Sequence, residues 1–207
     1  ICARKRVEVA LEALAARFAT LSGNAFFEAV SRHLVEALDL DLAFVGELVP
    51  NKALLKVRAG WAEGKALPAF EYALNTAPCS GFDSREMCLL ADSASRLFPH
   101  DRLLSEWGAE TYCAVPLLAK DGSGLGMMIA IKRERVHDCA ALRVLMDVFD
   151  DRVSAELERE RAEEGRRLAA SVFTHANEGI VITDAHGVVL DVNAAFCRIT
   201  AYAREEV

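Results

Sequence analysis

The chain has 207 residues, 53% of them apolar, which is enough to bury the core of one or two domains. Its formal net charge is −7, and its one compact basic run, Arg4-Lys5-Arg6, is short enough to be a solvated helix end. This balance argues against a surface for nucleic acid or anionic membrane. No apolar stretch approaches the roughly 18 residues of a membrane span, and the basic start lacks the apolar core of a secretory signal.

Six cysteines lie at positions 2, 79, 88, 113, 139 and 197. They form no Cys-x-x-Cys pair and have no histidine spacing suited to zinc. We therefore expect reduced thiols in a cytoplasmic protein, and no metal site.

The first 22 residues predict an amphipathic helix. Its apolar residues recur at alternating spacings of four and three, as in a heptad stripe: Val7, Leu11, Leu14, Phe18 and Leu21. A helix with so narrow an apolar stripe can pack either on the core of its own domain or against a helix from a second subunit. We expect residues 1–22 to be the dimerisation helix of a homodimer. A second helix, Ala25–Leu38, has a wider apolar stripe that faces the core.

Three strands are predicted next. Asp41–Val49 and Leu54–Trp61 are rich in strand-forming residues and are joined by a proline-containing turn. A third strand is expected over Leu67–Leu74. Asn75–Gly108 then contains turn residues, two cysteines and a short helix, Arg102–Trp107.

Two further apolar runs, Tyr112–Leu118 and Leu125–Ile131, flank the polar connection Asp121–Gly124. Asp-Gly between strand-like runs is a strong sign of a hairpin. Each run is almost continuously apolar, so both faces of this central antiparallel pair should be covered.

A long helix is expected from Asp138 to about Arg167. It begins with an apolar face and then becomes almost purely charged, in the run ERERAEEGRRL. The charged half is either a solvated helix with i,i+4 ion pairs or a connection between two domains that pairs with its mate in a dimer. Gly165 weakens it by about 1 kcal/mol relative to alanine, which suits a junction.

The order of these elements resembles a GAF domain, over about Phe26–Glu160. The sequence Pro78-Cys79, then Cys88, then Phe98-Pro99-His100-Asp101, then Gly108-x-x-x-Tyr112-x-x-Val-Pro-Leu resembles the GAF subgroup attached to bacterial diguanylate cyclases and histidine kinases. Cys113 departs from that pattern, which usually has a small residue or leucine. The resemblance implies an α+β fold, with residues 24–159 forming an antiparallel sheet of five or six strands and helices on one face.

Residues 168–207 resemble the first half of a PAS domain. The resemblance rests on a strand Ile180–Thr183, the turn Asp184–Gly187, a strand Val188–Val192 and the following Asn193. It departs at Ala201-Tyr202, where Gly-Tyr is usual. The rest of a PAS sheet does not follow, so we expect this segment to fold only partly and the chain to be a piece of a larger protein.

The GAF resemblance implies a ligand pocket between the sheet and a roof over Pro78–Trp107. The candidate ligand-binding residues are the unusual side chains of this region: Cys79, Phe82, Cys88, Asp92, Trp107 and Tyr112. For each of them, ordinary core packing is the alternative.

The sequence does not identify a cofactor. The signature of cyclic-nucleotide-binding GAF domains has no counterpart, and a bilin would need Cys88 with a following histidine that is missing. His100 and His137 lie in polar loops that are unsuited to haem. No catalytic triad or phosphate-binding glycine loop is found, so the fragment itself is not expected to be an enzyme.

We therefore expect a sensory input module of a bacterial signalling protein, which binds a small ligand or senses thiol state and relays the change through a helix to a PAS domain and an output domain. The first alternative is a ligand-free dimerisation and spacer module, in which Phe82 or Trp107 plugs the pocket. The second alternative is an enzyme, because Cys79, Cys88 and Cys113 superficially resemble the three cysteines of the GAF-fold free methionine-(R)-sulfoxide reductases. Against the enzyme, Met87–Leu90 replaces the expected glycine-rich segment, and Cys113 lies inside a strand.

Overall fold

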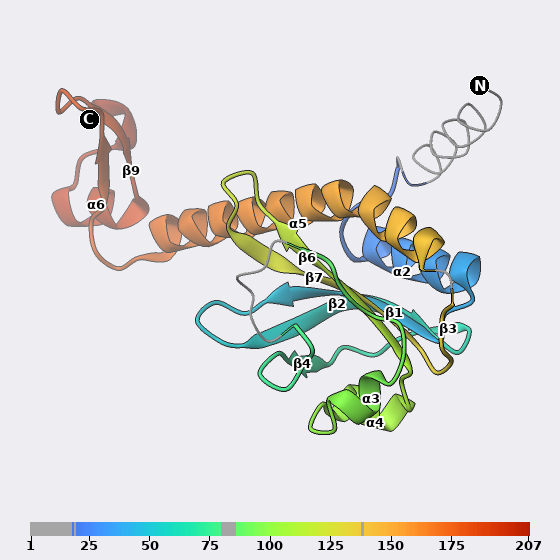
Figure 1. The fold of residues 1–207 in the computed structure, drawn as a ribbon. Coiled ribbons are helices and arrows are strands. Elements are labelled where there is room, and N and C mark those ends of the chain that lie inside the picture. Colours follow the sequence, from blue (N-terminus) through green and yellow to red (C-terminus); the bar gives the residue numbers. More distant parts are fainter. Residues whose placement is uncertain (1–17, 19, 80–85, 138) are drawn as a thin grey trace. The chain divides into compact units, whose positions relative to one another are not determined.

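A computed structural model describes residue 18 and residues 20–79, 86–137 and 139–207. The chain divides into two compact units, Ile1–Glu158 and Arg159–Val207, and each is described by itself (Figure 1). Nearly all of the expected dimerisation helix, and the candidate Phe82, lie outside the described residues.

The first unit is built on a seven-stranded antiparallel sheet. Six strands follow the order β3-β2-β1-β7-β6-β5, and the seventh, β4, pairs with the opposite end of β2 from β3. The strands are β1 Leu42–Leu48, β2 Leu54–Ala62, β3 Lys65–Ala66, β4 Glu71–Ala73, β5 Cys88–Leu90, β6 Thr111–Leu118 and β7 Gly124–Lys132. The predicted central hairpin is confirmed as β6 and β7, and β7 also pairs with β1.

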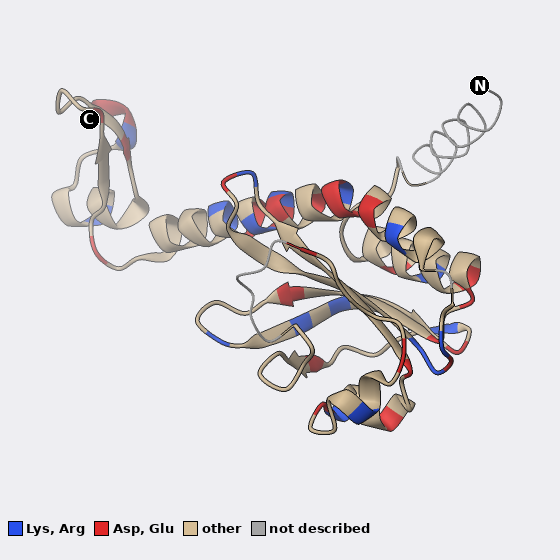
Figure 2. Ribbon diagram, viewed as in Figure 1, with Lys and Arg blue, Asp and Glu red and all other residues tan. Residues whose placement is uncertain are grey.

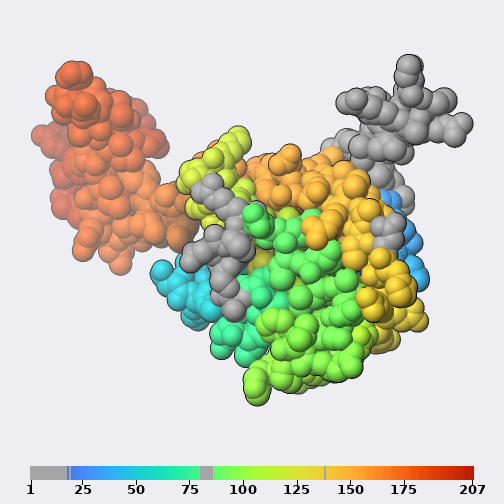
Figure 3. All heavy atoms as spheres, viewed as in Figure 1, coloured from blue at the N-terminus to red at the C-terminus, as the bar shows by residue number. Residues whose placement is uncertain are grey.

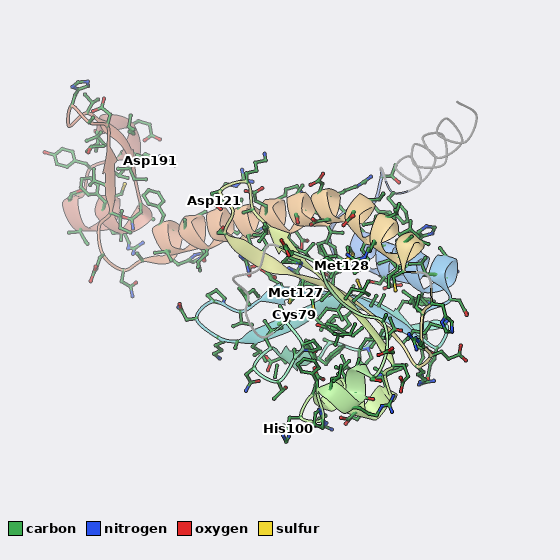
Figure 4. All side chains as sticks on the ribbon, in the orientation of Figure 1. Cys79, His100, Asp121, Met127, Met128 and Asp191 are labelled. Carbon is green, nitrogen blue, oxygen red and sulfur yellow. The ribbon has the colours of Figure 1, made fainter. Side chains whose placement is uncertain are left out.

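Both faces of the central hairpin are buried, as its continuous hydrophobicity predicts. Met128 joins the core on one face, and its neighbour Met127 joins the core on the other. Figure 4 shows these two side chains on β7 between the two layers that cover the sheet. Alternate residues of β7 therefore serve two separate cores.

The first face is covered by the long helices α2, Gly23–Leu38, and α5, Ala140–His175. The opposite face is covered by the segment around β4 and by two short helices, α3, Ala94–Leu97, and α4, Arg102–Trp107. The expected arrangement, with long helices on one face and a roof of loops and short helices on the other, is confirmed (Figure 1).

Three elements differ from the sequence-based expectation. The third strand is replaced by the short β3 and β4, because Pro68 between them lacks a backbone donor for the ladder. β5 arises in a region where only loops and short helices were expected, as a three-residue strand on the edge of β6. α5 extends to His175, past the expected end near Arg167.

The second unit contains the end of α5, a two-stranded hairpin of β8 Val181–Thr183 and β9 Val189–Val192, helix α6 Ala194–Thr200, and a short 3-10 turn. The Asp184 carboxylate accepts hydrogen bonds from the amides of His186 and Val188, at 2.8 and 2.9 Å, and closes the hairpin turn. This explains the aspartate of the predicted turn.

Asn193 connects the chain before β8 to the start of α6. Its side-chain oxygen accepts from the amides of Ile180 and Phe196, each at 2.9 Å, and its amide nitrogen donates to the Glu178 carbonyl at 3.0 Å. The side chain is 2% exposed. The asparagine therefore caps α6 and binds the chain before β8 at the same time.

Among the described helices, none combines the length and hydrophobicity that a membrane span requires.

Replacing Gly126 by alanine is expected to destabilise the first unit. A Cβ atom there would lie 2.1 Å from the backbone oxygen of Gly46 on the adjacent strand, and backbone cannot retreat as a flexible side chain can. We expect a loss of about 1–3 kcal/mol in the free energy of unfolding, measured by urea denaturation. An unchanged urea midpoint would contradict the close approach of β1 and β7.

The same substitution at Gly165 is expected to act in the opposite direction. A Cβ atom at Gly165 meets nothing within 4 Å, and the residue lies inside helix α5. Alanine should stabilise this part of the helix by about 1 kcal/mol. Amide hydrogen exchange across residues 161–170 should slow in the variant; faster exchange would show that the helix does not continue through this point.

Candidate functional site

A cavity of about 590 Å³ lies on the face of the sheet opposite the long helices, between the β4 segment and α4. Figure 3 shows the atoms of the α3 and α4 region, in green, against those of the β4 segment. Most of the lining is apolar and comes from Leu42, Leu67, Pro68, Phe70, Leu103 and Trp107. The polar residues of the lining are Glu71, Tyr72, Asn75, Thr76, His100, Asp101, Arg102 and Glu106.

Asp101 joins the two sides of the cavity. One carboxylate oxygen caps α4 by accepting from the Leu104 amide at 3.0 Å, and the other accepts from the Tyr72 hydroxyl at 2.5 Å. Asp101 is 1% exposed and Tyr72 is 4% exposed. Gly108, in the left-handed conformation, ends α4 after six helical residues. Two turn-forming residues thus define the short helix, and one of them also holds it against β4.

Tyr112 lies behind this pair, fully buried on β6. Burial, and the proximity of Tyr72 and Cys79, raise the pKa of its hydroxyl well above the usual range. Burial and the hydrogen bond to Asp101 raise the pKa of Tyr72 as well. Both tyrosines therefore stay neutral at any physiological pH. Within the described ranges, the Tyr112 hydroxyl has no hydrogen-bond partner.

Cys79 and Cys88 pack into the same core as Tyr112. Interaction with the Cys79 thiol lowers the pKa of the Cys88 thiol, whereas interaction with Cys88 and burial raise the pKa of the Cys79 thiol. Cys88 is thus the thiol that ionises first, and Cys79 keeps its proton.

Cys113 lies on the opposite face of the sheet. Its neighbour across the ladder is Leu89, and it packs with the residues of α2 and α5. Burial raises the pKa of Cys113 to about 12. The sheet therefore separates Cys113 from Cys79 and Cys88, and this removes the geometric basis for a three-cysteine catalytic group.

Five of the six candidate residues lie in the described part of the chain, and they occupy different places. Of these five, Trp107 alone lines the cavity, while Cys79, Cys88 and Tyr112 belong to the core beside it. Asp92 lies away from it, half exposed and 3.3 Å from Arg135.

The principal cavity residues missed from the sequence are Phe70, Tyr72 and Asp101. Asp101 could have been found as the residue that directly precedes a short predicted helix, where aspartate is a preferred cap. The sequence around Phe70 and Tyr72 predicts an ordinary strand, and nothing in it indicates that these residues line a cavity.

Trp107 is held from outside the cavity by Arg133. The guanidinium of Arg133 lies 4.6 Å from the centre of the indole ring, and it also bonds Glu63 at 3.1 Å. The adjacent Lys132 donates to the Asp39 carboxylate at 2.8 Å, and Asp39 is the residue that ends α2. The cavity is therefore connected, through Trp107 and Arg133, to the end of β7, beside the residue that ends α2.

The histidines considered for haem are exposed, and His100 lies at the outer end of the loop before α4 (Figure 4). In the described part of the chain, no three side chains of His, Cys, Asp or Glu come together in a way that could bind a metal ion.

Comparison with solved structures identifies the fold of the first unit. The phycocyanobilin-bound GAF domain from a cyanobacterial phytochrome is 15% identical with a TM-score of 0.58, over 75% of this chain and 96% of that one. The GAF domain of a phosphoenolpyruvate-protein phosphotransferase from Coxiella burnetii is 17% identical with a TM-score of 0.59, over 75% and 94%.

A similar fold occurs in the free methionine-R-sulfoxide reductase from Neisseria meningitidis, whose structure contains its substrate. It is 16% identical with a TM-score of 0.56, over 73% of this chain and 89% of that one. A search of curated proteins gives no match. The sequence model of the PAS fold matches residues 163–207, a few residues before the expected start. The chain therefore consists of a domain with the GAF fold followed by a segment of the PAS fold.

Proposed function

We propose that the first unit is the sensory input module of a signal-transduction protein and binds a small molecule in the cavity between β4 and α4. The cavity itself is the observation that supports this function. Its volume of about 590 Å³ lies in the range of small-molecule sites, and it combines an apolar lining with a few convergent polar groups. Trp107 lines the cavity without filling it, which argues against a spacer plugged by that residue.

The contacts of Trp107 could transmit ligand binding in the cavity to the positions of helices α2 and α5. A molecule that displaces the indole also displaces Arg133, which follows Lys132 at the end of β7. Lys132 holds the end of α2, and the chain then continues into α5. The ligand needs to prefer one arrangement of α2 and α5 by about 1–3 kcal/mol, which is typical of coupled sites.

In this proposal α5 carries the change into the PAS segment and then to an output domain, such as a diguanylate cyclase or histidine kinase. Charges of both signs alternate along α5, as a solvated helix requires (Figure 2). Val144, Leu168 and Val172 on this helix are more than half exposed, which favours pairing with a second copy. We propose a cytoplasmic homodimer that pairs through the terminal helices.

Filling the cavity is expected to remove its ligand. Ala73 on β4 lines the cavity, so phenylalanine there should occupy the space of a bound molecule. Native mass spectrometry of the protein purified from its own host should detect a bound small molecule in the wild type, and at least tenfold less in Ala73→Phe.

Ala66→Phe is the matched control, because Ala66 is an exposed residue of the same sheet that does not line the cavity. This variant should retain the molecule, and both variants should melt close to the wild type. If the wild type carries nothing, or if Ala73→Phe retains as much as Ala66→Phe, the proposed ligand site is wrong.

A second candidate function is sensing of thiol state by Cys79 and Cys88, supported by their contact and by the lowered pKa of Cys88. The Cys88 thiolate would attack hydrogen peroxide to give a sulfenic acid and hydroxide. The Cys79 thiol would then displace water and form a disulfide.

Peroxide treatment should therefore lower the mass by about 2 Da, from the loss of two hydrogens. Peptide mapping should place the disulfide between Cys79 and Cys88. Cys79→Ser and Cys88→Ser should abolish it, and Cys113→Ser should leave it intact because Cys113 lies across the sheet. Stable sulfinic acid at Cys88 in the wild type, without a disulfide, would show that the two thiols cannot meet.

A further inference from the structure

The apolar part of the cavity suits a molecule that carries an apolar ring. Phe70 and Trp107 contribute aromatic rings, and three leucines contribute hydrocarbon. Arg133 covers the indole of Trp107 at 4.6 Å but is not itself part of the lining. Burying an aromatic or aliphatic ring against this surface removes apolar area from water at both partners.

The charged groups that line the cavity are mostly acidic: Glu71, Asp101 and Glu106 against Arg102. Arg102 already pairs with Glu106 at 2.6 Å, and its side chain is 89% exposed, so its charge is largely neutralised and screened.

Asp101 contributes the charge that water screens least, because it is 1% exposed. The donors to its two oxygens are the Tyr72 hydroxyl and the Leu104 amide, and both donors are neutral. Arg133, behind Trp107, pairs with Asp41 and Glu63 at 3.9 and 3.1 Å. Among the described residues, the cavity lining therefore carries an excess of negative charge, because Arg102 and the nearby Arg133 are each paired with a carboxylate.

We propose that this cavity binds an organic cation: a molecule with a flat apolar body and an ammonium or amidinium group. The inference rests on the proposed function, in which the cavity is the ligand site. The apolar body lies against Phe70 and Trp107, and the cationic group lies toward the acidic residues of the lining, Glu71 and Asp101. An anion of the same shape is repelled by the same carboxylates.

Three small probes that differ in charge test this proposal: 2-phenylethylamine, 3-phenylpropionate and 2-phenylethanol. Each presents the same phenyl ring on a two-carbon chain, and the group at its end is cationic, anionic or neutral. Binding is followed through the fluorescence of Trp107 in a Trp61→Phe background, because 61 and 107 are the two tryptophan positions of the chain. Calorimetry on the unmodified protein provides an independent affinity.

We expect the amine to bind at least tenfold more tightly than the propionate, with the alcohol between them. This ratio is the order of magnitude for one poorly screened carboxylate a few ångströms from the charged group. The preference should shrink as salt is added, because Glu71 is exposed to solvent.

Glu71→Gln tests the charge without removing a structural contact of Asp101. It should weaken binding of the amine about threefold and leave the alcohol unchanged. Glu36→Gln is the matched control, because Glu36 is an exposed carboxylate on α2 that pairs with Arg32 away from the cavity. This control should change neither affinity.

The two possible failures are distinguishable. If the probes bind with equal affinity, or if the propionate binds best, the cavity is a ligand site but not one for cations, and this inference alone is overturned. If none of the three probes binds or alters Trp107 fluorescence, the cavity is not a ligand site, and the proposed function fails with it.

Discussion

The hydrogen bond between the Tyr72 hydroxyl and the Asp101 carboxylate is the contact on which the candidate site depends. It connects β4, at one side of the sheet, to the first turn of α4, and both partners are almost completely buried. The same carboxylate also caps α4. Removing either partner would leave a buried polar group unsatisfied, which costs about 1–3 kcal/mol. One aspartate therefore determines where α4 begins and how it lies against the strand that forms the other side of the cavity.

The β4 segment, α3 and α4 can cover one face of the sheet because both of its faces are apolar and buried. Met127 and Met128 are neighbours on β7 but belong to different cores, one under the roof and one under α2 and α5. Gly126, just before them, lets β7 approach the backbone of β1 closely. The long helices can then stabilise the domain from one side, which leaves the other side available for a cavity.

Local patterns predicted the elements that local chemistry determines. The β6–β7 hairpin, helix α4 and the Asp184 turn each followed from apolar runs or turn residues. The cavity could not be predicted in the same way, because Tyr72 and Asp101 meet only when β4 folds over α4. The position of Cys113 depended on register: Cys88 lies opposite Ala114, so Leu89 and Cys113 share the other face. A three-residue strand carries no sequence signal strong enough to give that register.

In the proposed function, the contacts at the end of β7 beside Trp107 are the link between a small cavity and the long helices. β7 ends there at Lys132, and α2 ends at Asp39; the two are joined by an ion pair of 2.8 Å in which the lysine is largely buried. Arg133 extends the same cluster to the indole, so one short segment contacts both the cavity and the end of a helix. In the proposed function, displacement of the indole would reach α2 through Arg133 and Lys132, and it would reach α5 through the residues that separate it from β7.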